Sequence, residues 1–126
     1  MLHSDIIKIA GINGWRVSIT KSGNGFFFDF QCLTPGGLPF TFTAELSGGC
    51  VDSLVDEIVA FVDALDPGRY AAEWAEASGN MSRARYLQAV ADMDVIRSRA
   101  WLLACDLSEF AANVDRLLNL PWFRRN

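Results

Sequence analysis

The chain has one histidine and three isolated cysteines, so the residues that build most nucleophilic and metal sites are scarce. His3 lies among the first residues, which we expect to fray, and a Ser-His-Asp or Cys-His relay therefore lacks its base. Cys32, Cys50 and Cys105 show no C-x-x-C spacing and are odd in number, which argues against zinc and against a disulfide framework. We expect all three to be small buried side chains. No catalytic residue, metal or cofactor is predicted, and the chain is predicted not to be an enzyme.

Long apolar runs are also missing. No stretch approaches the ~20 apolar residues that cross a bilayer, and Asp5 and Lys8 occupy the place of a signal peptide's apolar centre. We expect a cytoplasmic protein without membrane contact. The glycine pairs give no phosphate cradle: two clusters join strand to strand, and Gly48-Gly49 is followed by Asp52 and Asp56, which would repel phosphate.

What the chain does have is a large apolar fraction arranged in regular patterns. Hydrophobic residues make up 51% of the 126 residues and charged residues 21%, which is typical of one domain with a packed core. Apolar and polar residues alternate over 15–20, 26–33 and 40–46, predicting three strands joined by a hairpin loop over 21–25 and a turn over 34–39. One face of the sheet is rich in phenylalanine.

Four helices are predicted around these strands. The first starts at Ser4, the second spans 51–65, and the third spans 68–77 after an Asp66-Pro67 start. The fourth is a long C-terminal helix over 81–120. We therefore predict an α+β fold of order α-β-β-β-α-α-α: a three-stranded antiparallel meander with helices on one face. A single domain covers 1–120, and 121–126 form an aromatic and basic tail.

The long helix carries one continuous apolar seam. Its members follow at spacings of three and four: Ala89, Met93, Ile96, Ala100, Leu103, Leu107, Phe110, Val114 and Leu117. At 1.5 Å per residue the seam is ~42 Å long, which exceeds what three strands cover. We expect the excess to form a homodimer contact through this helix or a docking surface. Trp122 to Asn126 either cap the core, dock on a partner or are disordered.

The net charge of −4 hides a strong segregation. Residues 45–76 contain eight acids and one base, whereas 1–44 contain three bases and two acids, and 77–126 contain seven bases and five acids. Asp52, Asp56 and Asp63 fall on the outward side of the second helix, where a solvated surface is favoured over a Mg²⁺ or Ca²⁺ site. With Glu57 they are the predicted partner-binding residues. Asp92 and Asp94 face different directions on the long helix.

The element order over residues 4–65 is that of a double-stranded-RNA-binding domain, but the charges are opposite. Such a domain reaches phosphates with lysines at the start of its second helix, where this chain has Asp52, Asp56 and Glu57. We therefore expect no direct nucleic-acid binding. A surface of this kind is better suited to imitating nucleic acid.

Several short motifs resemble an uncharacterised family of small acidic proteins encoded on mobile elements of gut bacteria. The resemblance covers about residues 5–107 and is carried by Gly14-Trp15, Phe28 to Phe30, Leu33-Thr34-Pro35-Gly36 with Phe40 and Phe42, Leu65-Asp66-Pro67 with Trp74, and Val90-Ala91-Asp92-Met93. It implies gene context and no activity. The chain departs from the family in the loop after the tryptophan, which is shortened to Ser78-Gly79-Asn80.

These observations favour a non-enzymatic acidic interaction protein. The hypothesis is a phage or mobile-element inhibitor of a host defence complex, of the anti-CRISPR type, whose acidic surface binds a protein partner with a basic surface. One alternative is a small-ligand or nucleotide-binding protein with a pocket between the sheet and the long helix, using Arg97 and Arg99. Another is a purely structural dimeric domain.

Overall fold

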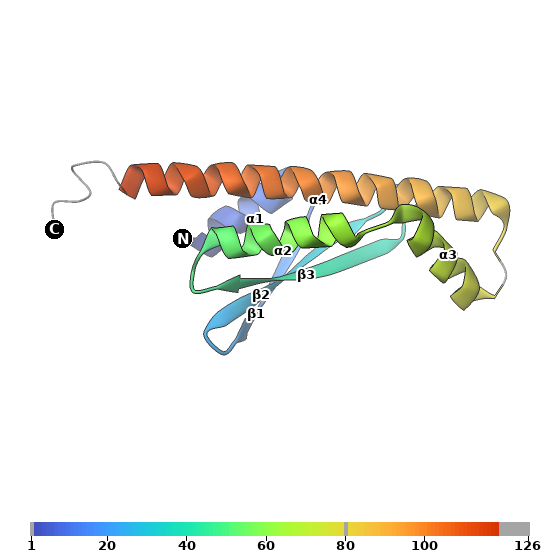
Figure 1. Cartoon of the computed structure of the whole chain (residues 1–126), viewed down its shortest axis with the longest axis horizontal. Coiled ribbons are helices and arrows are strands. Elements are labelled where there is room, and N and C mark those ends of the chain that lie inside the picture. The colour runs from blue at the N-terminus through green and yellow to red at the C-terminus, as the bar shows by residue number, and fades with distance from the viewer. Residues whose placement is uncertain (1, 80, 119–126) are drawn as a thin grey trace.

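A computed structural model describes residues 2–79 and 81–118, with side chains as far as residue 114. It confirms the α+β class and the predicted element order. The elements are α1 (Leu2–Ile12), β1 (Arg16–Ser22), β2 (Gly25–Leu33), β3 (Pro39–Ser47), α2 (Val51–Ala64), α3 (Pro67–Ser78) and α4 (Arg83–Leu118). Figure 1 shows the helices on one side of the sheet, with α4 running the length of the molecule.

The sheet is an antiparallel meander in the order β1-β2-β3. Ser22 pairs with Gly25, so the turn between β1 and β2 contains only Gly23-Asn24. Gly23 has a φ of +56°, a conformation that tight hairpin turns require and that glycine adopts without strain. The loop predicted over 21–25 was therefore too long, because the pairing between β1 and β2 continues as far as Ser22 and Gly25.

The phenylalanine face of the sheet forms the core, as predicted. Phe28 and Phe30 are fully buried. Phe42 on β3 lies with its ring centroid 5.1 Å from that of Trp15 and 4.2 Å from that of Phe61 on α2. Stacked and edge-on aromatic pairs at these separations add to the free energy of area burial. This cluster fixes α2 against β3.

The first helix differs from the prediction at its start. It begins at Leu2, so Ser4 lies inside the helix and does not start it. The His3 ring packs edge-on against Phe26 and Phe28, at centroid distances of 4.4 and 5.4 Å. The expectation that His3 lies in a frayed end was wrong, because these ring contacts hold it on the sheet.

The third helix begins and ends as its sequence predicts. The Asp66 side chain accepts a hydrogen bond from the Arg69 backbone N–H at 3.2 Å, and Pro67 is the first helical residue. Gly79 ends the helix with a φ of +75°. This short helix packs against the first half of α4, at the end of the molecule far from α1 (Figure 1).

The seam of α4 is buried within this chain over most of its length. Its members from Ala89 to Leu107 are at most 3% exposed, and Ala111 is also buried. The helices α1, α2 and α3 all contact α4 and cover the part that the sheet does not reach. As far as Ala111 the buried part of the seam is therefore covered within one chain, and a homodimer contact or docking surface on the remaining part stays a prediction. The Leu117 side chain and residues 121–126 lie outside the described residues.

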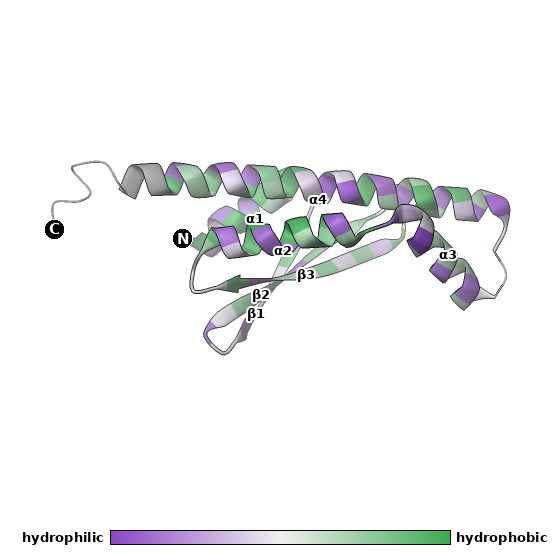
Figure 2. Ribbon diagram, in the orientation of Figure 1, coloured by the Kyte–Doolittle hydropathy of each residue, from purple (hydrophilic) through white to green (hydrophobic). Residues whose placement is uncertain are grey.

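Figure 2 shows hydrophilic and hydrophobic residues alternating along α4. Within residues 2–79 and 81–118, no helix combines the length and the hydropathy that a membrane span requires.

Candidate functional site

The four acidic residues of α2 that are predicted to bind a partner are all exposed. Asp52, Asp56 and Asp63 are exposed on the outward side of the helix, and we call them the acidic stripe. Glu57 is also exposed, but its Oε1 accepts a hydrogen bond from the Glu45 backbone N–H at 3.0 Å. Glu57 therefore attaches α2 to β3 and lies apart from the stripe.

Within the acidic stripe, only Asp52, in the first turn of α2, is placed where the helix dipole favours a carboxylate. Asp63 lies in the last turn of α2, where the helix dipole disfavours a carboxylate and no basic residue compensates. Asp52 and Asp56 are four residues apart, a spacing at which like charges repel. In the described part of the chain, none of the three forms an ion pair. The stripe is thus free to interact with an external positive charge.

An apolar groove between α2 and α4 lies beside the stripe. One hollow of about 440 Å³ and another of about 390 Å³ share Trp101, which is 49% exposed. Val55, Val59 and Val62 form the α2 wall. Val55 and Val59 each follow a member of the stripe by three residues and therefore lie close to it on the helix surface. We call the two hollows the α2–α4 groove. Leu102, 55% exposed, lies at one end.

Sequence reasoning missed this groove. Trp101 and Leu102 lie outside the seam of α4, and large apolar residues outside a helix's buried face were the available signal. Cys105 lines the same groove and is exposed, as is Cys50 before α2, so the prediction that all cysteines are buried holds only for Cys32. Burial raises the pKa of the Cys32 thiol, and the neighbouring Arg99 opposes that rise.

The two arginines predicted to hold a small ligand do not share a site. Arg97 lines the α2–α4 groove and pairs with Asp94, with Nη2 and Oδ1 3.5 Å apart. Arg99 donates from Nη1 to the Leu33 carbonyl at 3.2 Å, and its own carbonyl accepts from Trp15 Nε1–H at 3.3 Å. Arg99 thus holds the end of β2 against α4, whereas Arg97 faces the groove.

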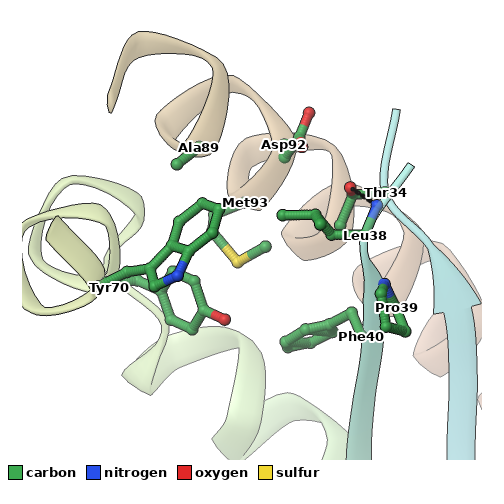
Figure 3. Close-up of a pocket in the computed structure, with 9 residues that line it drawn as sticks. Thr34, Leu38, Pro39, Phe40, Tyr70, Ala89, Asp92 and Met93 are labelled. Carbon is green, nitrogen blue, oxygen red and sulfur yellow. Dashed lines mark hydrogen bonds between the residues drawn. The ribbon is translucent and has the colours of Figure 1, made fainter. Parts of the chain in front are cut away.

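A separate pocket does lie between the sheet and α4. It has a volume of about 200 Å³ and is lined by Phe40 from β3, Tyr70 and Trp74 from α3, and Met93 and Asp92 from α4. Figure 3 shows Phe40 and Tyr70 on one side of the hollow and Ala89 and Asp92 on the other. Among the described residues, neither of the two predicted arginines lines this pocket. Its charged group is a carboxylate.

Asp92 is 2% exposed and holds the β2–β3 loop. Its Oδ2 accepts from the Gly36 backbone N–H at 3.2 Å, and its Oδ1 accepts from Gln88 Nε2–H at 2.7 Å. A Cβ on Gly36 would lie 2.6 Å from that Oδ2, so only glycine permits this approach. Gly36 therefore permits the close contact between this loop and the Asp92 carboxylate.

No family model, curated protein or solved structure matches the chain.

Proposed function

We propose that this protein is a non-enzymatic binding module whose α2–α4 groove receives a basic amphipathic helix of a protein partner. The observation that carries the proposal is the acidic stripe, unpaired and exposed, running beside an apolar groove with a half-exposed tryptophan. Apolar grooves between helices accept the apolar face of a third helix. The stripe would then face lysines or arginines on the flank of that helix.

The dimensions of the site suit such a partner. Asp63 follows Asp52 by eleven residues, or ~16.5 Å at the helical rise, which is about three turns of a partner helix. Trp101 lies where the two hollows meet, and a large aromatic side chain at the centre of an interface commonly provides most of its binding energy. The acidic charge would speed encounter with a basic partner.

A second copy of this chain suits the groove less well. A homodimer through this face would bring another acidic stripe into the interface, where like charges disfavour binding. Among the described residues that line the groove, the only base is Arg97, which already pairs with Asp94. Charge complementarity therefore favours a basic partner over self-association.

The experiment measures the affinity of the full chain for an 18-residue Leu/Lys peptide with helical spacing of its leucines. The triple variant Asp52→Asn, Asp56→Asn and Asp63→Asn should weaken binding about tenfold at low salt, or roughly 0.5 kcal/mol per carboxylate. Added salt should reduce this difference. A Trp101→Ala variant should lose about thirtyfold at any salt concentration, consistent with a loss of roughly 2 kcal/mol.

The matched control removes three acids elsewhere, with Asp29→Asn, Glu73→Gln and Glu76→Gln, and should bind nearly as well as the unaltered chain. A scrambled Leu/Lys peptide without an apolar stripe should bind weakly. Equal losses of peptide affinity in the two triple variants would show that only the total negative charge of the protein matters, and not the position of the acidic stripe. Concentration-dependent dimerisation that Trp101→Ala abolishes would assign the groove to a second copy and overturn the proposal.

A narrower form of the proposal is that the partner belongs to a host defence complex and that the protein inhibits it. Support comes from the segregated acidic charge, and the resemblance to mobile-element proteins that the sequence motifs predict would agree with it. The test is inhibition of a nucleic-acid-handling defence complex that the acidic-stripe triple variant no longer produces.

A further inference from the structure

The pocket between β3, α3 and α4 combines aromatic side chains with a buried carboxylate. Phe40, Tyr70 and Trp74 surround the same small volume as Asp92. The centroids of Phe40 and Tyr70 are 6.3 Å apart, with the rings nearly perpendicular. Ring faces attract cations that come within about 6 Å, and rings set at an angle offer a cation more than one such contact.

The hydrogen bonds of Asp92 leave its negative charge without a cationic partner. Both of its donors, the Gly36 N–H and the Gln88 amide, are neutral. Arg85 lines an adjoining hollow of about 120 Å³, but in the described part of the chain no base lies within ion-pair distance of Asp92. A carboxylate accepts about four hydrogen bonds, so Asp92 can accept further hydrogen bonds from a ligand. A bound cation would offset the cost of burying this charge.

The walls of the pocket select the kind of cation. Leu38, Pro39 and Met93 complete an apolar lining, and a metal ion would find one carboxylate where it needs several oxygen ligands. In the part of the chain that the structure describes, no group of three metal-binding side chains occurs. An organic cation with alkyl groups can contact both the aromatic rings and the aliphatic wall of the pocket.

We propose that this pocket binds a small alkylammonium ion, held by its methyl or methylene groups on Phe40, Tyr70 and Trp74 and by its charge near Asp92. A free amine and the side chain of a methylated lysine share this chemistry. The site uses none of the acidic stripe and none of the α2–α4 groove, so it stands independently of the proposed partner.

The test titrates choline and its neutral isostere, 3,3-dimethylbutan-1-ol, into the full chain and follows the Trp74 indole NMR signal. Choline should bind saturably and the isostere about tenfold more weakly, because only choline adds the cation contacts. Asp92→Asn removes the charge and keeps an acceptor for Gly36 and a polar group for Gln88. This variant should fold and lose about tenfold in choline affinity.

Two further variants separate the ring contacts from general charge. Tyr70→Leu keeps an apolar side chain of similar reach and should weaken choline severalfold. Asp63→Asn removes the same charge from α2 and should leave choline binding unchanged. N-acetyl-trimethyllysine amide stands for a methylated lysine side chain of another protein, and choline stands for a free small molecule. Whichever of the two binds more tightly indicates which kind of ligand the pocket takes, and tighter binding of either supports the site.

Three results would overturn the proposal. Equal binding of the neutral isostere would make the pocket a plain apolar cavity. An equal loss in Asp63→Asn and Asp92→Asn would show attraction to the acidic surface as a whole. No saturable change of the Trp74 signal with either cation would show that no ammonium site exists.

Discussion

At the scale of single residues, Asp92 links segments that are far apart in the sequence. Its carboxylate joins the β2–β3 loop, through Gly36, to Gln88 one turn earlier on α4. The same loop is closed by Thr34, whose backbone N–H donates to the Leu38 carbonyl at 2.8 Å and whose Oγ1 accepts from the Leu38 N–H at 3.1 Å. The carboxylate thereby positions one wall of the aromatic pocket.

The structural role of Asp92 gives the first prediction. Asp92→Ala removes the acceptor of two donors and should lower the free energy of unfolding by about 1–3 kcal/mol. Asp92→Asn keeps an acceptor and should cost clearly less. Urea denaturation measures both, with Asp94→Asn as the control, since Asp94 is exposed and its ion pair with Arg97 contributes about 0–1 kcal/mol. Similar losses for Asp92→Ala and Asp94→Asn would show that the loop does not depend on Asp92.

The three thiols should differ in reactivity. Burial raises the pKa of Cys32, so at any pH below that pKa its thiolate fraction is smaller than that of an ordinary cysteine. At about pH 8, iodoacetamide should therefore modify the exposed Cys50 and Cys105 faster than Cys32, and the Cys32 rate should approach theirs only at higher pH. Mass spectrometry of timed samples measures the three rates, and equal rates would contradict the burial of Cys32.

At the scale of elements, local patterns predicted most of the fold. The alternation in the strands and the seam of α4 each repeat over several residues, and the Asp66-Pro67 start of α3 involves only neighbours. The coverage of the seam could not be predicted, because it depends on where α3 packs along α4. The contact between Asp92 and Gly36 joins residues 56 positions apart and leaves no periodic signal.

For the predicted site residues too, helical spacing predicts their position on a helix, whereas contacts with other elements could not be predicted. Three of the four acids share the outward stripe because helical spacing alone places them there. Glu57 departs from it because it directly follows Asp56 and so lies about 100° farther around the helix. Only its hydrogen bond with the Glu45 backbone N–H on β3 could not be predicted from spacing. Arg97 and Arg99 separate because residues two apart on a helix face different directions.

The rotation of α4 about its own axis decides which of its residues face the core, and this gives a prediction at the element scale. Leu103 is fully buried, whereas its neighbour Leu102 is 55% exposed. Leu103→Ala should lower the free energy of unfolding by about 2–5 kcal/mol, since it leaves a cavity in the core. Leu102→Ala should change it by no more than about 0.5 kcal/mol. Thermal or urea denaturation compares the pair, and similar effects of both substitutions would mean that α4 is rotated relative to this structure.

At the scale of the whole molecule, charge and exposed apolar surface meet on one side. Residues 45–76 hold all of the excess acid, and the helix that carries four of these acids also forms one wall of the α2–α4 groove. The seam of α4 builds the core, and the neighbouring face with Trp101 stays open. The long helix thus supplies both the scaffold and half of the proposed binding surface.

The most direct test of this account is the tryptophan indole NMR spectrum of the full chain during titration with the amphipathic Leu/Lys peptide. Trp101 lies in the groove, whereas Trp15 is 2% exposed in the core and Trp74 lines the separate pocket. The account predicts that the Trp101 signal moves to saturation, that Trp15 and Trp74 stay nearly unchanged, and that the acidic-stripe triple variant needs about tenfold more peptide. A Trp101 signal that stays in place while the peptide binds would contradict it.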